Sequence, residues 1–202
     1  FYWVQDHIKY IAWEDGLGGF IPRKPELVYQ RRYGDCKDMA NLTTNLLKLA
    51  GIDAHLTWIG TRHIPYTYEA VPTPSVDNHM ICAVKENGQW IFLDATGQFV
   101  KYGMPSTDIQ SKEALIGIDE NKFEVVKVPV VKSSDNVISD SIFLSIENNA
   151  VKGRGHRTMT GLAKYDLVAR WLGVTPAKRI ESFAEFLEFG NNKCKTDSVS
   201  YT

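Results

Sequence analysis

The length, composition and charge of this chain limit the classes of protein that it can represent. Its 202 residues are 44% hydrophobic and 23% charged, which is ordinary for a soluble globular protein of one large domain or two small ones. The formal net charge of −1 argues against nucleic acid or an anionic membrane surface as a partner, and no apolar run approaches the roughly 18 residues of a membrane span.

The chain shows no signal peptide, and it opens at Phe1 in mid-pattern without an initiator methionine. We therefore expect it to be part of a longer protein, whose targeting segment would lie upstream. Its three cysteines include no CxxC pair and do not form a disulfide framework. None of the five histidines pairs with a cysteine at the spacing of zinc ligands, so the sequence predicts no metal site and no cofactor.

The first part of the chain is expected to form a helix, a loop and a short helical turn. Val4, Ile8 and Ile11 follow one another at helical spacing and predict a helix within residues 1–13 that packs against the next long helix. Glycines and prolines then break the chain into a loop, and Pro25 can begin a short helical turn.

The next segment predicts a tight turn that leads into a buried helix over residues 36–50. Gly34 permits a backbone angle that other residues resist. Asp35 is a good N-cap residue, and Asp38, three residues later, can reach back to it in a loose capping box. Gly51 is the expected stop. The apolar stripe of this helix consists of Met39, Leu42, Leu46, Leu47, Leu49 and Ala50.

Cys36 is the first residue of this predicted helix. Unpaired backbone N–H groups and the positive end of the helix dipole favour a thiolate at such a position. A cysteine placed in this way is either a nucleophile or a small hydrophobic residue that begins a core helix. The choice depends on whether a histidine and a carboxylate approach it from elsewhere in the chain.

After Gly51, the alternation of apolar and polar residues predicts a strand over residues 54–60. Residues 61–78 then form a long segment with three prolines. Loops of this length are often functional, and a surface excursion is the equally acceptable alternative.

Two strands flank Asn87-Gly88, a dipeptide typical of type I′ hairpin turns. With a two-residue turn, the strand register makes His79 and Asp94 diagonal neighbours on one face of the hairpin, close enough to meet. A one-residue change in the turn would put them on opposite faces. The same parity puts Cys82 on the other face, where we expect it to pack in the core.

The second half of the chain is expected to add strands and helices without a catalytic constellation. Residues 105–120 are expected to form a linker-like or short helical stretch. The predicted elements are strands over 123–131, 139–146 and 151–160, a helix over 162–172, and a second helix that begins at Thr175-Pro176.

Cys36, His79 and Asp94 together would make a Cys-His-Asp triad. A neighbouring imidazole can take the thiol proton and stabilise the thiolate, and a carboxylate fixes the tautomer and orientation of the imidazole. The thiolate would attack a carbonyl carbon, and the resulting oxyanion needs hydrogen-bond donors. One candidate donor is the backbone N–H of Cys36. The second is an upstream side chain, namely that of Trp3, Trp13 or Gln30.

Three stretches resemble the transglutaminase-like core of the papain-like cysteine protease and transglutaminase superfamily. They are Gly34-Asp35-Cys36-Lys37-Asp38 at a helix start, Asn78-His79 at a strand start, and Leu93-Asp94-Ala95-Thr96 at the end of the hairpin. Tyr33 and Gly51-Ile52 resemble more narrowly the version found in large bacterial proteins, where this core lies between two β-rich domains of unknown function. The resemblance covers roughly residues 1–104 and is weak beyond them.

The resemblance implies an α+β fold. A papain-like catalytic core over residues 1–104 would pack a central, cysteine-bearing helix on an antiparallel sheet, and residues 105–202 would be a smaller extension of strands and helices. It also implies Cys36 as nucleophile, His79 as general base and then acid, and Asp94 as the orienting carboxylate. Such bacterial proteins usually carry an export signal, which predicts the periplasm or the cell surface. No acidic cluster suited to calcium is present, in contrast to the animal transglutaminases.

The expected function is thiol-dependent acyl transfer from a peptide or protein substrate through a thioester. Water as the acceptor gives a protease or amidase, and an amine gives a transglutaminase; we favour hydrolysis of a peptide or amide bond. A binding module that keeps the fold without activity is the remaining alternative. It is disfavoured because all three triad positions hold the required residue types.

Overall fold

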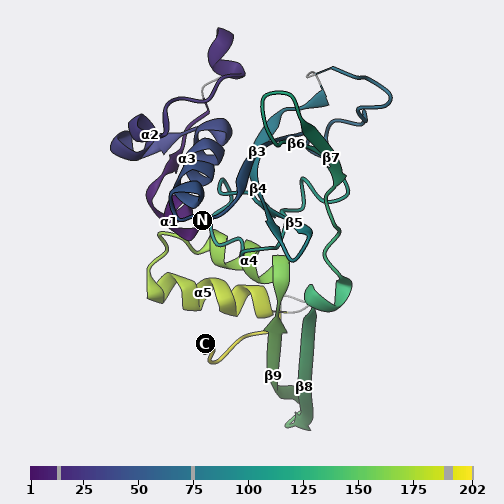
Figure 1. The fold of residues 1–202 in the computed structure, drawn as a ribbon. Helices are drawn as coiled ribbons and strands as arrows, with labels where there is room; N and C mark the ends of the chain where they lie inside the picture. The colour runs from purple at the N-terminus through teal and green to yellow at the C-terminus, as the bar shows by residue number, and fades with distance from the viewer. Residues whose placement is uncertain (13–14, 74–75, 189–192, 202) are drawn as a thin grey trace. The chain divides into compact units, whose positions relative to one another are not determined.

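The computed structural model describes residues 1–202 except 13–14, 74–75, 189–192 and 202. The chain divides into two compact units, one from Phe1 to Tyr165 and the other from Asp166 onward. None of the described helices is long and apolar enough to cross a membrane. The elements drawn in Figure 1 are α1 (Tyr2–His7), β1 (Lys9–Tyr10), η1 (Gly16–Gly19), α2 (Pro25–Arg31), β2 (Tyr33–Gly34), α3 (Cys36–Leu49), β3 (Ala54–Ile59), β4 (His79–Glu86), β5 (Gln89–Leu93), β6 (Glu113–Gly117), β7 (Phe123–Lys127), η3 (Ser133–Asp135), β8 (Ile138–Glu147), β9 (Ala150–Met159), α4 (Gly161–Arg170) and α5 (Pro176–Leu187).

A curled antiparallel sheet in the order β5-β4-β3-β6-β7 forms the centre of the first unit (Figure 1). Helix α3 contacts β3 and β4, and Leu47 of this helix packs against a core cluster that includes Cys82 and Val84. Ile59 and Ile81, which have the opposite parity on their strands, belong to a second cluster. A central helix on an antiparallel sheet confirms the predicted α+β class.

The sheet continues beyond residue 104. Strands β6 and β7 lie in the same sheet as β3, β4 and β5, and β6 pairs directly with β3. The sheet is thus built from strands on both sides of the predicted boundary. The division of the chain at residue 104 stays a prediction.

Helix α3 begins and ends as predicted. Asp35 is its N-cap: the Asp38 N–H donates to Asp35 Oδ1 at 3.2 Å, and the Asp35 N–H donates to Asp38 Oδ2 at 3.1 Å. The chain leaves the helix through Gly51, whose φ of 78° lies in the left-handed region that glycine favours. The buried stripe is narrower than predicted, because Leu49 in the last turn is 86% exposed.

The β4–β5 hairpin has the predicted turn and register. Asn87 and Gly88 have φ values of 49° and 80°, as a type I′ turn requires, and Glu86 pairs with Gln89. Cys82 is completely buried on the face of β4 that packs toward α3, in agreement with its expected role in the core. The turn therefore sets which side chains at the far end of the hairpin can meet.

The N-terminal helix is shorter than predicted. It ends at His7, and Ile8 already has extended backbone angles, with φ −111° and ψ 116°. The chain then forms β1, which pairs in parallel with β2 directly before α3, and the Lys9 N–H donates to the Arg32 carbonyl at 2.9 Å. Strand pairing thus ends the helix, and Ile11 lies outside it with 39% of its surface exposed.

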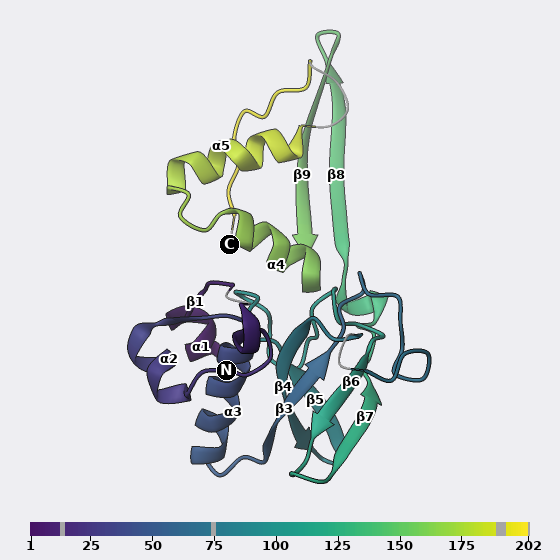
Figure 2. The same ribbon diagram turned by 90° about the horizontal axis from the view of Figure 1, so that it is seen from above.

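The second half contains the predicted strands and helices with small changes in length. The prediction of a linker or short helix over residues 105–120 was wrong at strand β6, which pairs with β3 and β7 in the central sheet. Strands β8 and β9 pair over their whole length as a two-stranded ribbon (Figure 2). Helices α4 and α5 begin and end within a few residues of the predicted bounds. The strand predicted over 123–131 is shorter, because β7 ends at Lys127.

Candidate active site

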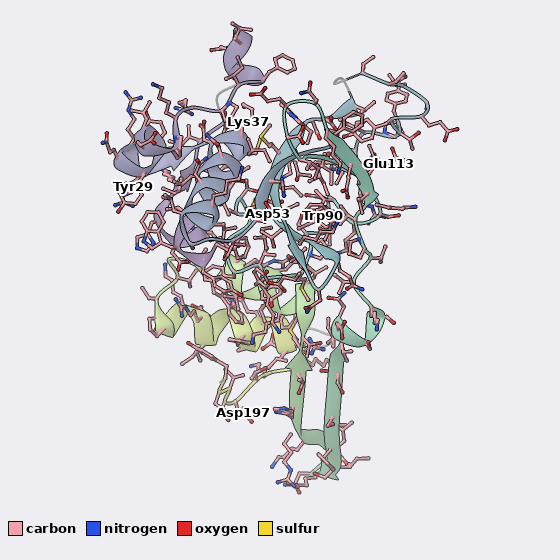
Figure 3. The ribbon with its side chains drawn as sticks, in the orientation of Figure 1. Tyr29, Lys37, Asp53, Trp90, Glu113 and Asp197 are labelled. Carbon is pink, nitrogen blue, oxygen red and sulfur yellow. The ribbon has the colours of Figure 1, made fainter. Side chains whose placement is uncertain are left out.

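Cys36 is the first residue of α3 and has only 5% of its surface exposed. Its neighbour Lys37 marks this end of the helix in Figure 3. Because Cys36 directly follows the N-cap, its backbone N–H is one of the first-turn amides that no helical carbonyl can satisfy. The thiol therefore sits at the positive end of the α3 dipole, on an element fixed by a complete capping box.

His79 and Asp94 meet at the open end of the hairpin, as its register predicts. His79 is the first residue of β4, Asp94 directly follows β5, and His79 Nε2 lies 3.0 Å from Asp94 Oδ2. The Cys36 thiol also acts on His79, because its hydrogen bonding and charge help to raise the pKa of the imidazole. Since Nε2 faces the carboxylate, Nδ1 is the ring nitrogen that remains for another partner. A buried carboxylate thus holds the imidazole, and the thiol at the start of α3 affects its protonation.

The surroundings of this imidazole favour its protonated form. Burial by itself lowers the pKa of His79, but the hydrogen bonds with Asp94 and Cys36 and their charges outweigh burial and raise that pKa to about 10. Burial raises the pKa of Asp94, while the hydrogen bond and charge of His79 together with Thr96 bring it below the ordinary value. An ionised carboxylate beside a protonated imidazole is the result at neutral pH.

Asp94 is held in place by neighbours on the chain that follows the hairpin. Thr96 donates to Asp94 Oδ1 from its hydroxyl at 2.6 Å and from its backbone N–H at 3.1 Å. The Ser106 hydroxyl lies 3.4 Å from Asp94 Oδ2. The sequence pattern assigned no such role to either residue. An aspartate whose side chain bonds a residue two positions later is a familiar turn, and that spacing could have identified Thr96.

Comparison with family models matches residues 1–95 to the transglutaminase-like superfamily. This range contains the cysteine at the helix start, the histidine and the aspartate. Residues 1–95 belong to the transglutaminase-like superfamily. The resemblance to the transglutaminase-like core predicted from the sequence motifs is thereby confirmed.

No curated protein matches the sequence. Among solved structures, a protein from Parabacteroides distasonis ATCC 8503, described as a "putative protease", is similar with a TM-score of 0.48 and 10% sequence identity. The similarity covers 81% of this chain and 30% of that one, so the present chain spans less than a third of the length of that protein.

Two ion pairs, one buried and one partly buried, hold the first turn of α3 in the transglutaminase-like domain. Lys37 Nζ lies 2.8 Å from Asp35 Oδ2, and the two side chains are only 3% and 2% exposed. Arg23 Nη2 lies 2.6 Å from Asp38 Oδ2, while the Arg23 backbone N–H and Nε also donate to Asp38. Asp35 and Asp38 were predicted as capping residues, but their basic partners were not. Arg23 lies 15 positions before Asp38, so no local spacing indicates the pair.

Gly34 is required for space and not for an unusual backbone angle. Among the described residues it is not one of those with positive φ, so the predicted reason for this glycine was wrong. A Cβ at Gly34 would come within 2.5 Å of the Asp38 Cβ. Glycine therefore lets the turn before Cys36 pass close to the capping carboxylate.

Replacement of Gly34 by alanine is expected to destabilise the transglutaminase-like domain by about 1–3 kcal/mol, because the new methyl group overpacks against Asp38. Urea unfolding would measure the loss. Gly117→Ala is the matched control, since its Cβ would meet nothing closer than 3.5 Å. Equal midpoints for the two variants would contradict the close approach at Gly34.

The second oxyanion donor stays a prediction. Trp3 stacks on His7 and on Tyr29, with ring centroids 4.7 and 5.2 Å apart. Gln30 is exposed on α2. The third candidate, Trp13, lies outside the described residues.

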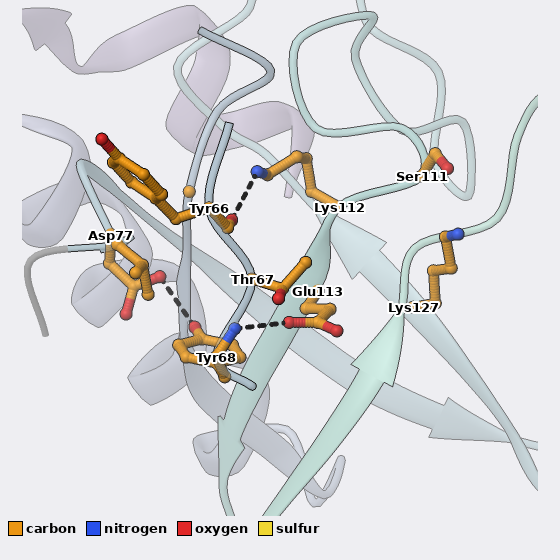
Figure 4. A pocket seen from close by; sticks show the side chains of 10 residues that line it. Tyr66, Thr67, Tyr68, Asp77, Ser111, Lys112, Glu113 and Lys127 are labelled. Carbon is orange, nitrogen blue, oxygen red and sulfur yellow. Dashed lines mark hydrogen bonds between the residues drawn. The ribbon is translucent and has the colours of Figure 1, made fainter. Parts of the chain in front are cut away.

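A separate pocket lies where the chain before β4 crosses the β6 and β7 strands (Figure 4). The Tyr68 hydroxyl donates to Asp77 Oδ1 at 2.7 Å, the Tyr68 N–H donates to Glu113 Oε2 at 2.8 Å, and Lys112 Nζ donates to the Ile64 carbonyl at 2.6 Å. These bonds tie the long segment that follows β3 to the sheet. No member of the predicted triad lines the pocket. Within the described part of the chain, no group of three or more His, Cys, Asp or Glu residues could hold a metal ion.

Proposed function

We propose that this transglutaminase-like domain hydrolyses a peptide or amide bond in a peptide or protein substrate, through a triad of Cys36, His79 and Asp94. The observation that carries the proposal is the His79 imidazole, which bonds Asp94 at 3.0 Å and whose pKa is raised in part by the Cys36 thiol. A thiol, a base and an orienting carboxylate in this order are the parts that nucleophilic cysteine catalysis needs.

In the first half of the reaction, the Cys36 thiolate attacks the carbonyl carbon of the scissile bond. The negative charge that develops on the carbonyl oxygen is stabilised by the Cys36 backbone N–H at the positive end of α3. The protonated His79 then gives its proton to the leaving amine as the carbon–nitrogen bond breaks. A thioester on Cys36 and a neutral imidazole remain.

In the second half, the neutral His79 takes a proton from water as the water oxygen attacks the thioester carbon. The carbon–sulfur bond breaks, the acid product leaves, and the thiolate and imidazolium form again. Asp94 keeps the ring oriented in both halves through its bond to Nε2. An amine in place of water would make the same domain a transglutaminase.

Mass spectrometry after iodoacetamide treatment at pH 6 tests the proposal. Cys36 is expected to be alkylated selectively, because an imidazolium stabilises its thiolate. Burial raises the pKa of the Cys82 thiol to about 11, so this cysteine stays unreactive, and Cys194 serves as the reference for a cysteine without a histidine–aspartate pair. Equal labelling of Cys36 and Cys194, or no labelling of Cys36, would contradict an enzymatic role and favour a binding module.

The proposal extends to the setting of the domain. We expect it to belong to a longer bacterial protein with flanking β-rich domains, exported to the periplasm or the cell surface. This part rests on the motif resemblance at Cys36, His79 and Asp94. Cell fractionation with an antibody against the domain would test it.

A further inference from the structure

Lys37 is an unusual residue for the interior of a protein. It directly follows Cys36 on the first turn of α3, where Figure 3 labels it. Its side chain is only 3% exposed, although lysine is almost never fully buried unless it is paired. Its Nζ lies 2.8 Å from Asp35 Oδ2, and Asp35 is itself 2% exposed. The charge of Lys37 is therefore paired with the carboxylate of Asp35, the residue directly before the cysteine.

Asp35 presents an electrostatic difficulty that this pair resolves. As N-cap it accepts the Asp38 N–H and so fixes the turn that carries Cys36. Its carboxylate, however, immediately precedes a cysteine that needs a negative charge, and a like charge nearby disfavours ionisation. Burial strengthens that repulsion, because water does not screen it. An ammonium on the same carboxylate cancels most of it.

The other charged groups that we describe at this site and at the start of α3 are paired as well. From the hairpin, His79 bonds Asp94, and from the loop before α2, Arg23 bonds Asp38. Lys37 is the cation assigned to Asp35. Without it, the buried carboxylate next to Cys36 would be left uncompensated, which neither of the other two pairs could correct.

On the basis of the proposed function, we infer that Lys37 is a positioning residue that neutralises the N-cap carboxylate of Asp35 so that Cys36 ionises. Lys37 does not touch the reacting atoms in this role. It acts through Asp35 on the charge state of the thiol. The pair lets an aspartate serve as the helix cap without opposing the nucleophile that it positions.

The experiment measures the rate of Cys36 alkylation by iodoacetamide between pH 4 and pH 10, by mass spectrometry on the full chain. In Lys37→Met the midpoint of the pH profile should rise by about one pH unit or more, because Asp35 is left unpaired. In Asp35→Asn, which keeps a capping oxygen, the midpoint should fall, because Lys37 is left unpaired. In the double variant it should return close to that of the wild type.

The opposite directions of the midpoint shifts in Lys37→Met and Asp35→Asn distinguish this role from a purely structural one. A loosened helix start would shift both single variants in the same direction, and that result, or an unchanged midpoint in all three variants, would overturn the inference. If Lys37→Met does not fold, the double variant is compared with Asp35→Asn. The midpoint of the double variant should then be about one pH unit higher than that of Asp35→Asn. Equal midpoints of these two variants would overturn the inference. Failure of the proposed function is visible independently, as a wild-type Cys36 no more reactive at pH 6 than Cys194.

Discussion

Replacement of Cys36 by alanine is expected to reduce hydrolysis of a peptide or glutaminyl amide substrate by about 10⁴-fold or more. The variant lacks the sulfur that forms the thioester, so neither half of the reaction can proceed through a covalent intermediate. Any remaining turnover would come from binding and the oxyanion donors alone. Ammonia release from glutaminyl peptides and cleavage of an unstructured protein substrate would measure the loss.

Cys194→Ala is the control for this variant and should keep the activity of the wild type. The stability of Cys36→Ala must be measured alongside, because the thiol is 5% exposed and its loss leaves a small cavity. A folded Cys36→Ala protein with wild-type turnover would show that the activity lies elsewhere in the chain.

The same assay distinguishes hydrolysis from transfer in the wild-type protein. With hydrolysis, an added primary amine is not incorporated into the glutaminyl peptide, and the product is the free acid. Incorporation of the amine would identify the domain as a transglutaminase and overturn our preference for water as the acceptor. In both cases Cys36→Ala must abolish the reaction.

The features that the sequence predicts best are those that depend on neighbours a few residues apart. Asn87-Gly88 selects one turn type, the turn fixes the register, and the register alone brings His79 to Asp94. The start of α3 follows in the same way from an acidic N-cap at Asp35. Local rules of this kind were enough to bring together the candidate site on the hairpin.

The features that were missed depend on contacts between distant parts of the chain. The N-terminal helix ends early because β1 pairs with β2, where the Lys9 N–H donates to the Arg32 carbonyl, and apolar spacing cannot indicate this pairing. Leu49 fits the helical stripe but points to solvent, since its periodicity does not say how far the partner surface extends. Lys37 is only two positions from Asp35, but its burial was missed because it depends on the packing of the rest of the fold around the start of α3.

Replacement of Asp94 by asparagine is expected to lower turnover by between about 10²- and 10⁴-fold while the fold is kept. The amide has the size of the carboxyl group and can still bond His79 and Thr96, so the packing around the hairpin end changes little. It carries no charge, however, and its oxygen and nitrogen can bond either tautomer of the imidazole. His79 would lose both the orientation and the stabilised protonated form that the reaction uses.

The pKa shifts of His79 and Asp94 determine the direction in which the pH dependence of kcat/KM should change in Asp94→Asn. In the wild type the pKa of His79 is raised to about 10. The stability that the protonated imidazole contributes through its pair with Asp94 is therefore fully present below about pH 6.5. It is lost as the pH rises through about 10. The pKa of Asp94 is lowered, so on the acid side the pair is lost only as the pH falls below its ordinary range. In Asp94→Asn the alkaline limb of kcat/KM should therefore move from about pH 10 toward the ordinary range of histidine.

Asp53→Asn provides the matched control, because Asp53 also faces a histidine, with Oδ1 3.1 Å from His55 Nε2, but is 80% exposed. A pair whose carboxylate is exposed to water contributes little, so this variant should keep both the turnover and the alkaline limb of the wild type. An Asp94→Asn protein whose alkaline limb stays at pH 10 would show that another group holds the proton on His79. The carboxylate would then be a structural ligand of Thr96, and the triad would reduce to a pair of Cys36 and His79.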